Sequence, residues 1–183
     1  SPSDQTTNKI ITAIESTDND AHFGTLVFTK NDLAWALEDV FNNGSEVTGI
    51  IEQINTQGSE YEYLLELGID VRSHMGVSGQ FHHKYCIIDQ AETTSDPIVI
   101  TGSHNWSSAA ENNNDENTLI IHDANITNQY YQEYVERFNE LPQATLASWN
   151  CVSDACIDPG NGSGTFNSLE SCEASCTSSV EEY

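Results

Sequence analysis

Two short stretches of the chain could bring together side chains that act on phosphorus. The first runs from Phe81 to Asp89 and places His82 and Lys84 two residues apart in an apolar segment. In an extended strand such residues point to the same side, so an imidazole and an ammonium would lie together. A histidine can attack phosphorus as a nucleophile, and a lysine can hold negatively charged phosphoryl oxygens.

The second stretch, Gly102-Ser103-His104-Asn105, follows the apolar run Ile98-Val99-Ile100. We expect a helix to begin near Asn105, with the Ser103 hydroxyl, the Asn105 amide and free N–H groups forming an anion site at its start. A plain helix cap would explain Ser103 and Asn105 by themselves. It would not explain them together with the histidine and the lysine, so the two stretches predict a phosphodiester site.

The spacing of these residues resembles that of the phospholipase D superfamily, the HKD phosphodiesterases. The matching positions are His82, Lys84 and Asp89 for H-x-K-x4-D, Gly102, Ser103 and Asn105 for G-S-x-N, and Glu116 for the acidic position that follows. The stretch between Asp89 and Gly102 is longer than the usual hairpin of the family. We expect an extra turn at residues 92–97 and two intact strands, because surface loops tolerate insertions at little cost.

The resemblance implies a role for each matched residue and a reaction without metal or other cofactor. His82 would attack a phosphodiester to give a phosphohistidine, which water or an alcohol then releases. Glu116 would accept a hydrogen bond from the far ring nitrogen of His82, and Asp89 would be a supporting carboxylate rather than a proton donor. The residues expected to bind the phosphoryl group are Gly102, Lys84, Ser103 and Asn105.

Other residues near the motif have simpler interpretations. His83 is the alternative nucleophile, but the distance to Lys84 and Asp89 selects His82, and His83 should point to the opposite face. A metal cluster of His82, His83 and His104 is a further alternative. We expect the histidines at 22, 74, 104 and 122 to be either hydrogen-bonded in the interior or exposed at the surface, and Trp106 to pack in the core. Core or interface positions are expected for Tyr61, Tyr63, Tyr130, Tyr131 and Tyr134. A wall of the substrate site is the alternative for these tyrosines.

The chemistry that the resemblance implies uses two histidines, whereas one unit supplies one. The second histidine, from a facing unit, would protonate the leaving oxygen. The chain would therefore either form a homodimer or be half of a longer protein. It opens at Ser1 with neither a Met nor a signal peptide, and we read it as a mature or cleaved fragment.

The chain is strongly acidic, with 5 Lys and Arg against 29 Asp and Glu and a formal net charge of -24. Such a surface favours a dispersed, secreted or salt-adapted protein, and calcium binding by some carboxylates is the alternative. No basic stripe suited to nucleic acid and no basic amphipathic helix suited to lipid is evident. The substrate therefore stays open between phospholipid headgroups and nucleic acid. No apolar run reaches the roughly 20 residues of a transmembrane segment.

The cysteines fall into two groups. Cys86 lies in the apolar strand and should be a buried, inert thiol. Four others lie close together near the end of the chain, at Cys151, Cys156, Cys172 and Cys176. They predict two disulfides in one of three pairings, an oxidising compartment, and a secreted or cell-surface protein of bacterial type; a zinc site is the alternative.

Alternating apolar periodicities predict an α/β fold, a layered mixed β-sheet flanked by helices. Strands are expected at residues 22–29, 47–51, 69–71 and 118–121 besides the two motif strands. The last helix should carry Ile126, Tyr130, Tyr134 and Phe138 on one face. We expect a phospholipase D-like domain at residues 1–143 and a cysteine-rich, disulfide-stapled tail at residues 144–183.

A function without catalysis is the competing hypothesis. A secreted acidic protein with a cross-linked tail could be an adhesive or surface-assembly module on an inherited fold. Against this, the six fixed positions of H-x-K-x4-D and G-S-x-N serve no packing purpose, and a lysine is costly to bury without a partner. The phosphodiesterase is therefore the preferred hypothesis.

Overall fold

Six strands form one mixed sheet in the order β3-β2-β1-β4-β5-β6. β1, β2 and β3 are parallel, whereas β4, β5 and β6 each run antiparallel to the strand before them in this order. Their bounds are Asp20–Thr25 for β1, Glu46–Ile51 for β2, Asp70–Ser73 for β3, Lys84–Ile88 for β4, Ile98–Gly102 for β5 and Thr118–His122 for β6. β1 is buried at all its positions because it lies in the middle of the sheet.

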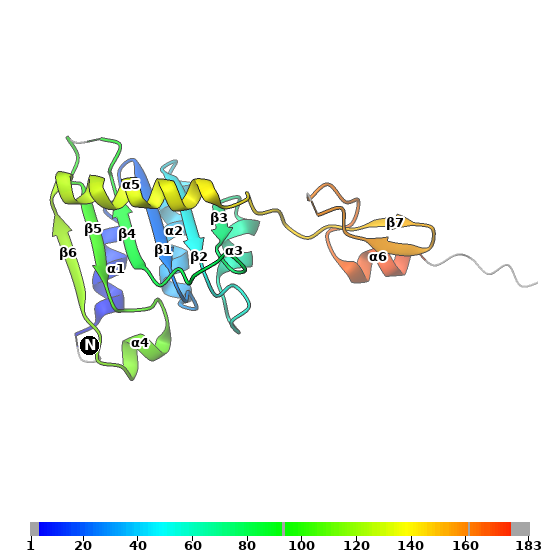
Figure 1. Ribbon diagram of the computed structural model, residues 1–183, viewed down its shortest axis with the longest axis horizontal. Coiled ribbons are helices and arrows are strands. Elements are labelled where there is room, and N and C mark those ends of the chain that lie inside the picture. Colours follow the sequence, from blue (N-terminus) through cyan, green and yellow to red (C-terminus); the bar gives the residue numbers. More distant parts are fainter. Residues whose placement is uncertain (1–3, 93, 161, 177–183) are drawn as a thin grey trace, which may run out of the picture. The chain divides into compact units, whose positions relative to one another are not determined.

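Helices cover both faces of the sheet (Figure 1). The helices α1 (Thr6–Ile14), α2 (Asn31–Asn42) and α3 (Tyr61–Glu66) lie on one face, and α5 (Ala124–Glu140) lies across the other. Each face has its own core: one contains Ile10, Leu37, Phe23 and Cys86, and the other contains Tyr85, Ile87, Val99 and Tyr134. The predicted α/β layered sheet is therefore confirmed.

The computed structural model describes residues 4–92, 94–160 and 162–176. The chain divides into two compact units, residues 1–144 and 145–183. The boundary expected from the sequence, between residues 143 and 144, lies one residue before this division. No helix in the described part of the chain combines the length and the hydrophobicity of a transmembrane segment.

The long connection between the two motif strands leaves their pairing intact. β4 ends at Ile88, β5 begins at Ile98, and the antiparallel register runs from Tyr85 opposite Thr101 to Ile88 opposite Ile98. The expected extra turn at residues 92–97 lies in this connection, with residue 93 outside the described ranges. The insertion thus lengthens a loop and keeps both strands.

The helix expected near Asn105 begins later and is short, so this prediction was wrong. α4 spans Ser108–Asn112 with Ser107 as its N-cap. The preceding segment is held in an extended form, because the Trp106 N–H donates to Val27 at 3.1 Å and the Trp106 carbonyl accepts from Thr29 at 2.8 Å. These bonds to the chain after β1 delay the helix until Ser107.

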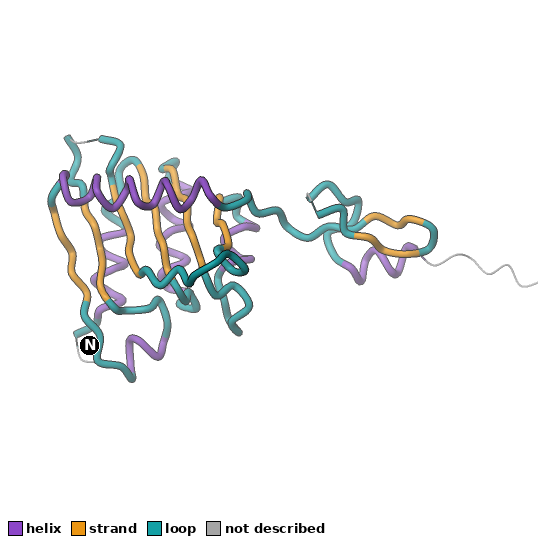
Figure 2. The backbone as a smooth tube through the Cα atoms, viewed as in Figure 1, coloured by secondary structure: helices purple, strands orange, loops and turns teal. Residues whose placement is uncertain are grey.

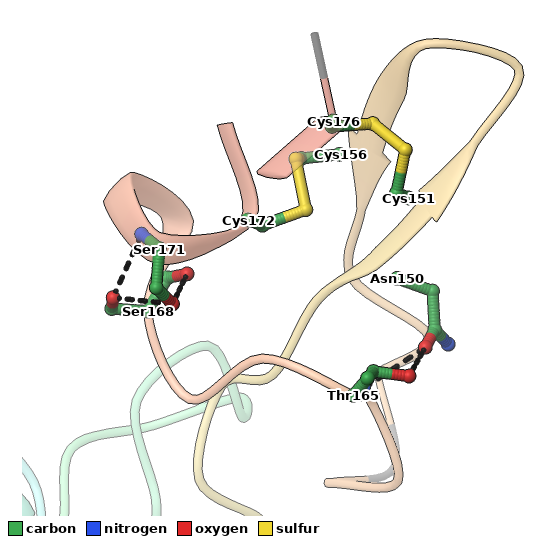
Figure 3. The surroundings of a disulfide bond; sticks show 8 residues. All are labelled: Asn150, Cys151, Cys156, Thr165, Ser168, Ser171, Cys172 and Cys176. Atoms are coloured by element: carbon green, nitrogen blue, oxygen red, sulfur yellow. Dashed lines mark hydrogen bonds between the residues drawn. A yellow bond between two sulfur atoms is a disulfide. The ribbon is translucent and has the colours of Figure 1, made fainter. Parts of the chain in front are cut away.

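The second unit contains a two-stranded sheet of β7 (Asn150–Val152) and β8 (Ala155–Ile157) and the helix α6 (Leu169–Cys176). Two disulfides link them, Cys151 to Cys176 and Cys156 to Cys172 (Figure 3). The two predicted disulfides are confirmed, in a nested pairing in which one bridge joins the outer cysteines and the other the inner ones. Cys86 is a buried free thiol, as expected.

Candidate active site

The motif residues other than Asp89 lie at one edge of the sheet, where β4 begins and β5 ends. The register places Lys84 opposite Thr25 at the end of β1, and Gly102 opposite Thr118 at the start of β6. Loops extend from this edge of the sheet, including the one that carries α4 (Figure 2). The antiparallel pairing of β4 and β5 therefore brings His82 and Lys84 close to Gly102 and Ser103, about 20 residues later in the chain.

His82 and Lys84 lie in direct contact. The Lys84 ammonium is 3.2 Å from Nδ1 of His82 and donates to the His82 carbonyl oxygen at 2.8 Å. His82 is exposed just before β4, whereas Lys84 is buried. Burial lowers the pKa of Lys84, and the negative charge of Glu116 opposes this shift. The site thus holds a desolvated cation beside an accessible imidazole.

Ser103 and Glu116 form a second pair across the start of β6. The Ser103 hydroxyl donates to the Glu116 carboxylate, and the Asn114 amide donates to the same carboxylate at 3.2 Å. The bond from Ser103 lowers the pKa of Glu116, and the positive charge of Lys84 lowers it further. Glu116 is therefore a carboxylate at neutral pH. Its hydrogen bonds go to these two residues, and not to His82 as the resemblance implied.

Gly102 allows β5 and the chain before β6 to approach closely. A Cβ atom at this position would lie 2.1 Å from the Asn117 carbonyl oxygen, and the Gly102 φ of +154° disfavours other residues. The Ser103 N–H, one residue on, donates to the same carbonyl at 3.0 Å. The glycine therefore sets the geometry of the loop that carries Ser103.

Asn105 and His104 share the loop after Gly102. The Asn105 side-chain oxygen is buried and has no hydrogen-bond partner among the described residues. His104 is buried, with Nε2 3.3 Å from the Glu111 carboxylate but without the alignment of a hydrogen bond. Glu111 also accepts from the backbone N–H and the hydroxyl of Thr7, which ties α4 to α1. This loop is therefore anchored to the rest of the domain.

Asp89 lies away from the other motif residues. It follows the last residue of β4, roughly 16 Å along the strand from Lys84 at 3.3 Å per residue. Its carboxylate accepts from the backbone N–H groups of Asp18 at 3.0 Å and Asn19 at 2.8 Å, and from the Ser95 hydroxyl at 2.7 Å. The structure thus places Asp89 as a supporting carboxylate that ties two loops together.

His83 lies on the opposite face from Lys84, as expected from the alternation of a strand. Its ring is 4.7 Å from that of Phe81 and 5.3 Å from that of Tyr85, and its Nε2 is 3.5 Å from Glu133 on α5. Burial lowers the pKa of His83, although Glu133 opposes the shift. Tyr85 donates to the same carboxylate at 2.9 Å.

A pocket of about 380 Å³ adjoins the motif and extends to α5. Its lining includes His82, Lys84, Gly102, Tyr85, Tyr130 and Glu133. The sequence pattern does not distinguish Glu133, because a carboxylate at the polar edge of an amphipathic helix resembles any solvated residue. A larger pocket of about 520 Å³, lined by Lys9, Ile98 and His122 among others, contains none of the motif residues.

The remaining aromatic and histidine positions largely follow the expectations. Trp106 is buried and packs against Phe28 at 4.8 Å between ring centroids, which confirms its place in the core. His22 and His74 are buried with polar partners, whereas His122 is exposed beside Asp96. Tyr134 is a core residue, but Tyr130 lines the motif pocket.

The chain matches the family model described as "Cardiolipin synthase, PLD-like domain" over residues 10–141. It is 28% identical over 152 residues to a mitochondrial cardiolipin hydrolase of Canis lupus familiaris, covering 82% of this chain and 57% of that protein. The chain thus spans a little over half the length of this relative.

Two bacterial structures share the fold. One is a phospholipase D family member, Nuc from Salmonella typhimurium, with a TM-score of 0.66 and 24% identity over 75% of this chain and 90% of that one. The other is NucT from Helicobacter pylori, with a TM-score of 0.65 and 25% identity over the same shares. The family match and the assembled motif lead to one conclusion: the chain belongs to the phospholipase D superfamily, with a phospholipase D-like unit in residues 10–141.

Proposed function

We propose that this chain is a phosphodiesterase that cleaves its substrate through a phosphohistidine on His82. The observation that supports this most is the buried Lys84 ammonium beside the accessible His82 ring, 3.2 Å from Nδ1. A buried ammonium is costly unless an anion compensates it, and a phosphoryl group is a suitable anion. The names of the relatives, which include cardiolipin hydrolase, make a phosphodiester the first substrate class to test.

In the first step the Lys84 ammonium donates its hydrogen bonds to the phosphoryl oxygens instead of to His82. The Nδ1 lone pair of His82 is then free. An unprotonated ring nitrogen of His82 attacks phosphorus, the N–P bond forms and the bond to the leaving oxygen breaks. Lys84 and the Asn105 amide stabilise the charge on the remaining phosphoryl oxygens. Ser103 and Glu116 hold the loop beside them, and water then releases the phosphoryl group from His82.

A second unit of the same kind supplies the proton for the leaving oxygen. One unit carries one motif histidine, and leaving-group protonation requires a separate acid. The facing unit comes either from a second copy of this chain or from another part of a longer protein. Two disulfides in the tail support an oxidising compartment and hence a secreted or cell-surface location.

Hydrolysis of bis(p-nitrophenyl) phosphate in excess EDTA tests the proposal. We expect activity that survives EDTA and disappears in His82→Asn, whereas His122→Asn, a change at an exposed histidine, keeps it. If EDTA abolishes the activity, the reaction depends on a metal ion and the histidine mechanism is wrong. The test is repeated at protein concentrations high enough to drive association and with any candidate partner unit added. If no turnover appears under these conditions, the result favours the catalytically silent adhesive module.

A further inference from the structure

A glutamate and a histidine outside the motif lie at the same edge of the sheet as His82. Glu52 directly follows β2, and His74 directly follows β3. The register of the sheet aligns Lys84, the first residue of β4, with the last residues of β1, β2 and β3. Because these strands end in one row, Glu52 and His74 lie at the edge where the chain passes through His82 into β4.

The Glu52 carboxylate connects His74 to the residue that precedes the nucleophile. Its Oε2 atom accepts from Nδ1 of His74 at 2.7 Å and from the backbone N–H of Phe81 at 3.0 Å. Because a carboxylate only accepts, the His74 ring carries a proton on Nδ1. The exposed fractions of the His74 and Glu52 side chains are 9% and 13%, so both bonds are largely shielded from water. Shielded bonds to a carboxylate are stronger than those between neutral groups in water.

The bond to Phe81 stands at the end of an exposed loop. Residues 75–80 are all exposed, and Gly76 and Gly79 have positive φ values of 90° and 87°. Phe81 is the first buried residue after this loop, and the next residue, His82, is exposed again. The chain that leads to His82 is therefore fixed at Phe81, by the packing of its ring and by the bond from its N–H.

Two backbone hydrogen bonds flank His82. On one side the Phe81 N–H donates to Glu52, and on the other side the Leu26 N–H donates to the carbonyl oxygen of His83 at 3.0 Å. Together they set the direction in which the His82 side chain leaves the backbone. Loss of the bond to Glu52 would free the chain on one side of the nucleophile.

We propose that Glu52 and His74 are a positioning pair for His82. Glu52 holds the backbone beside the nucleophile, and His74 fixes the orientation of the Glu52 carboxylate. The inference rests on the proposed phosphodiesterase function and adds two residues outside the H-x-K-x4-D and G-S-x-N positions. Attack on phosphorus is sensitive to such placement, since a displacement of about 1 Å can cost about 100-fold in rate.

Two substitutions of Glu52 separate the hydrogen bond from the charge. Glu52→Ala removes the acceptor, whereas the amide oxygen in Glu52→Gln can accept both bonds. With bis(p-nitrophenyl) phosphate we expect Glu52→Ala to lower kcat about 10- to 100-fold and to change KM less than about threefold, because Lys84 keeps its pairing with β1. Glu52→Gln should retain kcat within about threefold. His74→Phe keeps a ring beside Phe81 but loses the bond, and its kcat should lie between those two.

Glu46→Ala is the matched control, since it makes the same change at the exposed first residue of β2, at the far end of the strand. It should leave kcat and KM unchanged. Urea unfolding of each variant gives the folded fraction under assay conditions and so separates lost positioning from a lost fold. Equal losses of kcat in Glu52→Ala and Glu52→Gln would assign the effect to charge and overturn the proposal. A full kcat in folded Glu52→Ala, or a loss confined to KM, would overturn it as well.

A measurement without turnover distinguishes failure of the pair from failure of the enzyme. Exchange of the Phe81 amide hydrogen with D2O, followed by NMR, should be slow in the native chain and in Glu52→Gln and at least about tenfold faster in Glu52→Ala. The imidazole signals of His82 should shift in Glu52→Ala, whereas those of the exposed His122 should not. If the native chain hydrolyses no diester, the proposed function fails and this comparison still tests the pair. Unchanged exchange at Phe81 together with unchanged His82 signals would reject it.

Discussion

The Lys84 ammonium lies 3.2 Å from Nδ1 of His82 and donates to the carbonyl oxygen of the same residue at 2.8 Å. Among the described residues, no carboxylate lies within ion-pair distance of this buried lysine. The Lys84 ammonium is thus positioned by its contacts with His82 and is largely shielded from water. A buried cation destabilises the free protein, and a bound anion would offset this cost.

Replacing Lys84 should therefore move activity and stability in opposite directions. Lys84→Met keeps the length of the side chain and removes the charge. We expect kcat/KM to fall about 100-fold or more, because the donor to the phosphoryl oxygens is lost. The Tm should stay equal or rise, because a buried charge is no longer desolvated. A joint fall of Tm and activity in thermal unfolding and kinetic assays would contradict this account.

Removing the charge of Glu116 should shift the pH profile. Burial lowers the pKa of Lys84 below its ordinary value of 10.5 and Glu116 raises it again, so Glu116→Gln lowers it further. Because protonated Lys84 is the active form, the alkaline limb of kcat/KM should move to lower pH. Asp115→Asn, at the exposed neighbouring position, is the control. An alkaline limb that stays in place or moves up would refute the coupling.

Asp89→Asn should affect stability rather than chemistry. Asn tolerates the left-handed φ of 54° at this position and can accept one of the bonds from Asp18 and Asn19, but it lacks the charge. We expect a loss of about 1–2 kcal/mol in the free energy of unfolding, measured with urea. Asp96→Asn, at an exposed side chain, should cost less than about 0.5 kcal/mol. A large fall of kcat/KM in folded Asp89→Asn would instead make Asp89 a catalytic residue.

Gly102→Ala should disrupt the loop that carries Ser103. The new Cβ atom would meet the Asn117 carbonyl oxygen at 2.1 Å, and backbone atoms cannot move aside cheaply. We expect a loss of about 3 kcal/mol in unfolding free energy together with a loss of activity. Gly76→Ala is the control, since φ is +90° there but nothing lies within 4 Å of the new atom. It should cost about 1 kcal/mol, and equal losses at both glycines would rule out the steric account.

Thiol titration should distinguish the free cysteine from the four that are paired. The chain has 5 cysteines, and burial raises the pKa of Cys86 to about 12. The native protein should therefore present no reactive thiol, the denatured protein one, and the denatured and reduced protein five. Five thiols without reductant would exclude both disulfides, and peptide mapping under non-reducing conditions checks the Cys151–Cys176 link.

The sequence by itself determined the family, the layered α/β fold and the motif residues. Those inferences depend on local properties: the spacing of His82 and Lys84 along a strand, the apolar periodicities, and four clustered cysteines. The contact between His82 and Lys84 follows from two-residue spacing, because a strand places such side chains on one face.

Only the tertiary structure decided which distant groups meet. The five residues of β4 separate Asp89 from Lys84. The register of β5 with β6 places Glu116 next to Ser103, whose hydroxyl donates to its carboxylate. The bonds of Trp106 to the chain after β1 delay the start of α4, and the fold of the tail selects one cysteine pairing of three. The placement of α5 on the sheet brings Glu133 to the pocket of His82. Each of these depends on how separate elements pack, which local patterns do not encode.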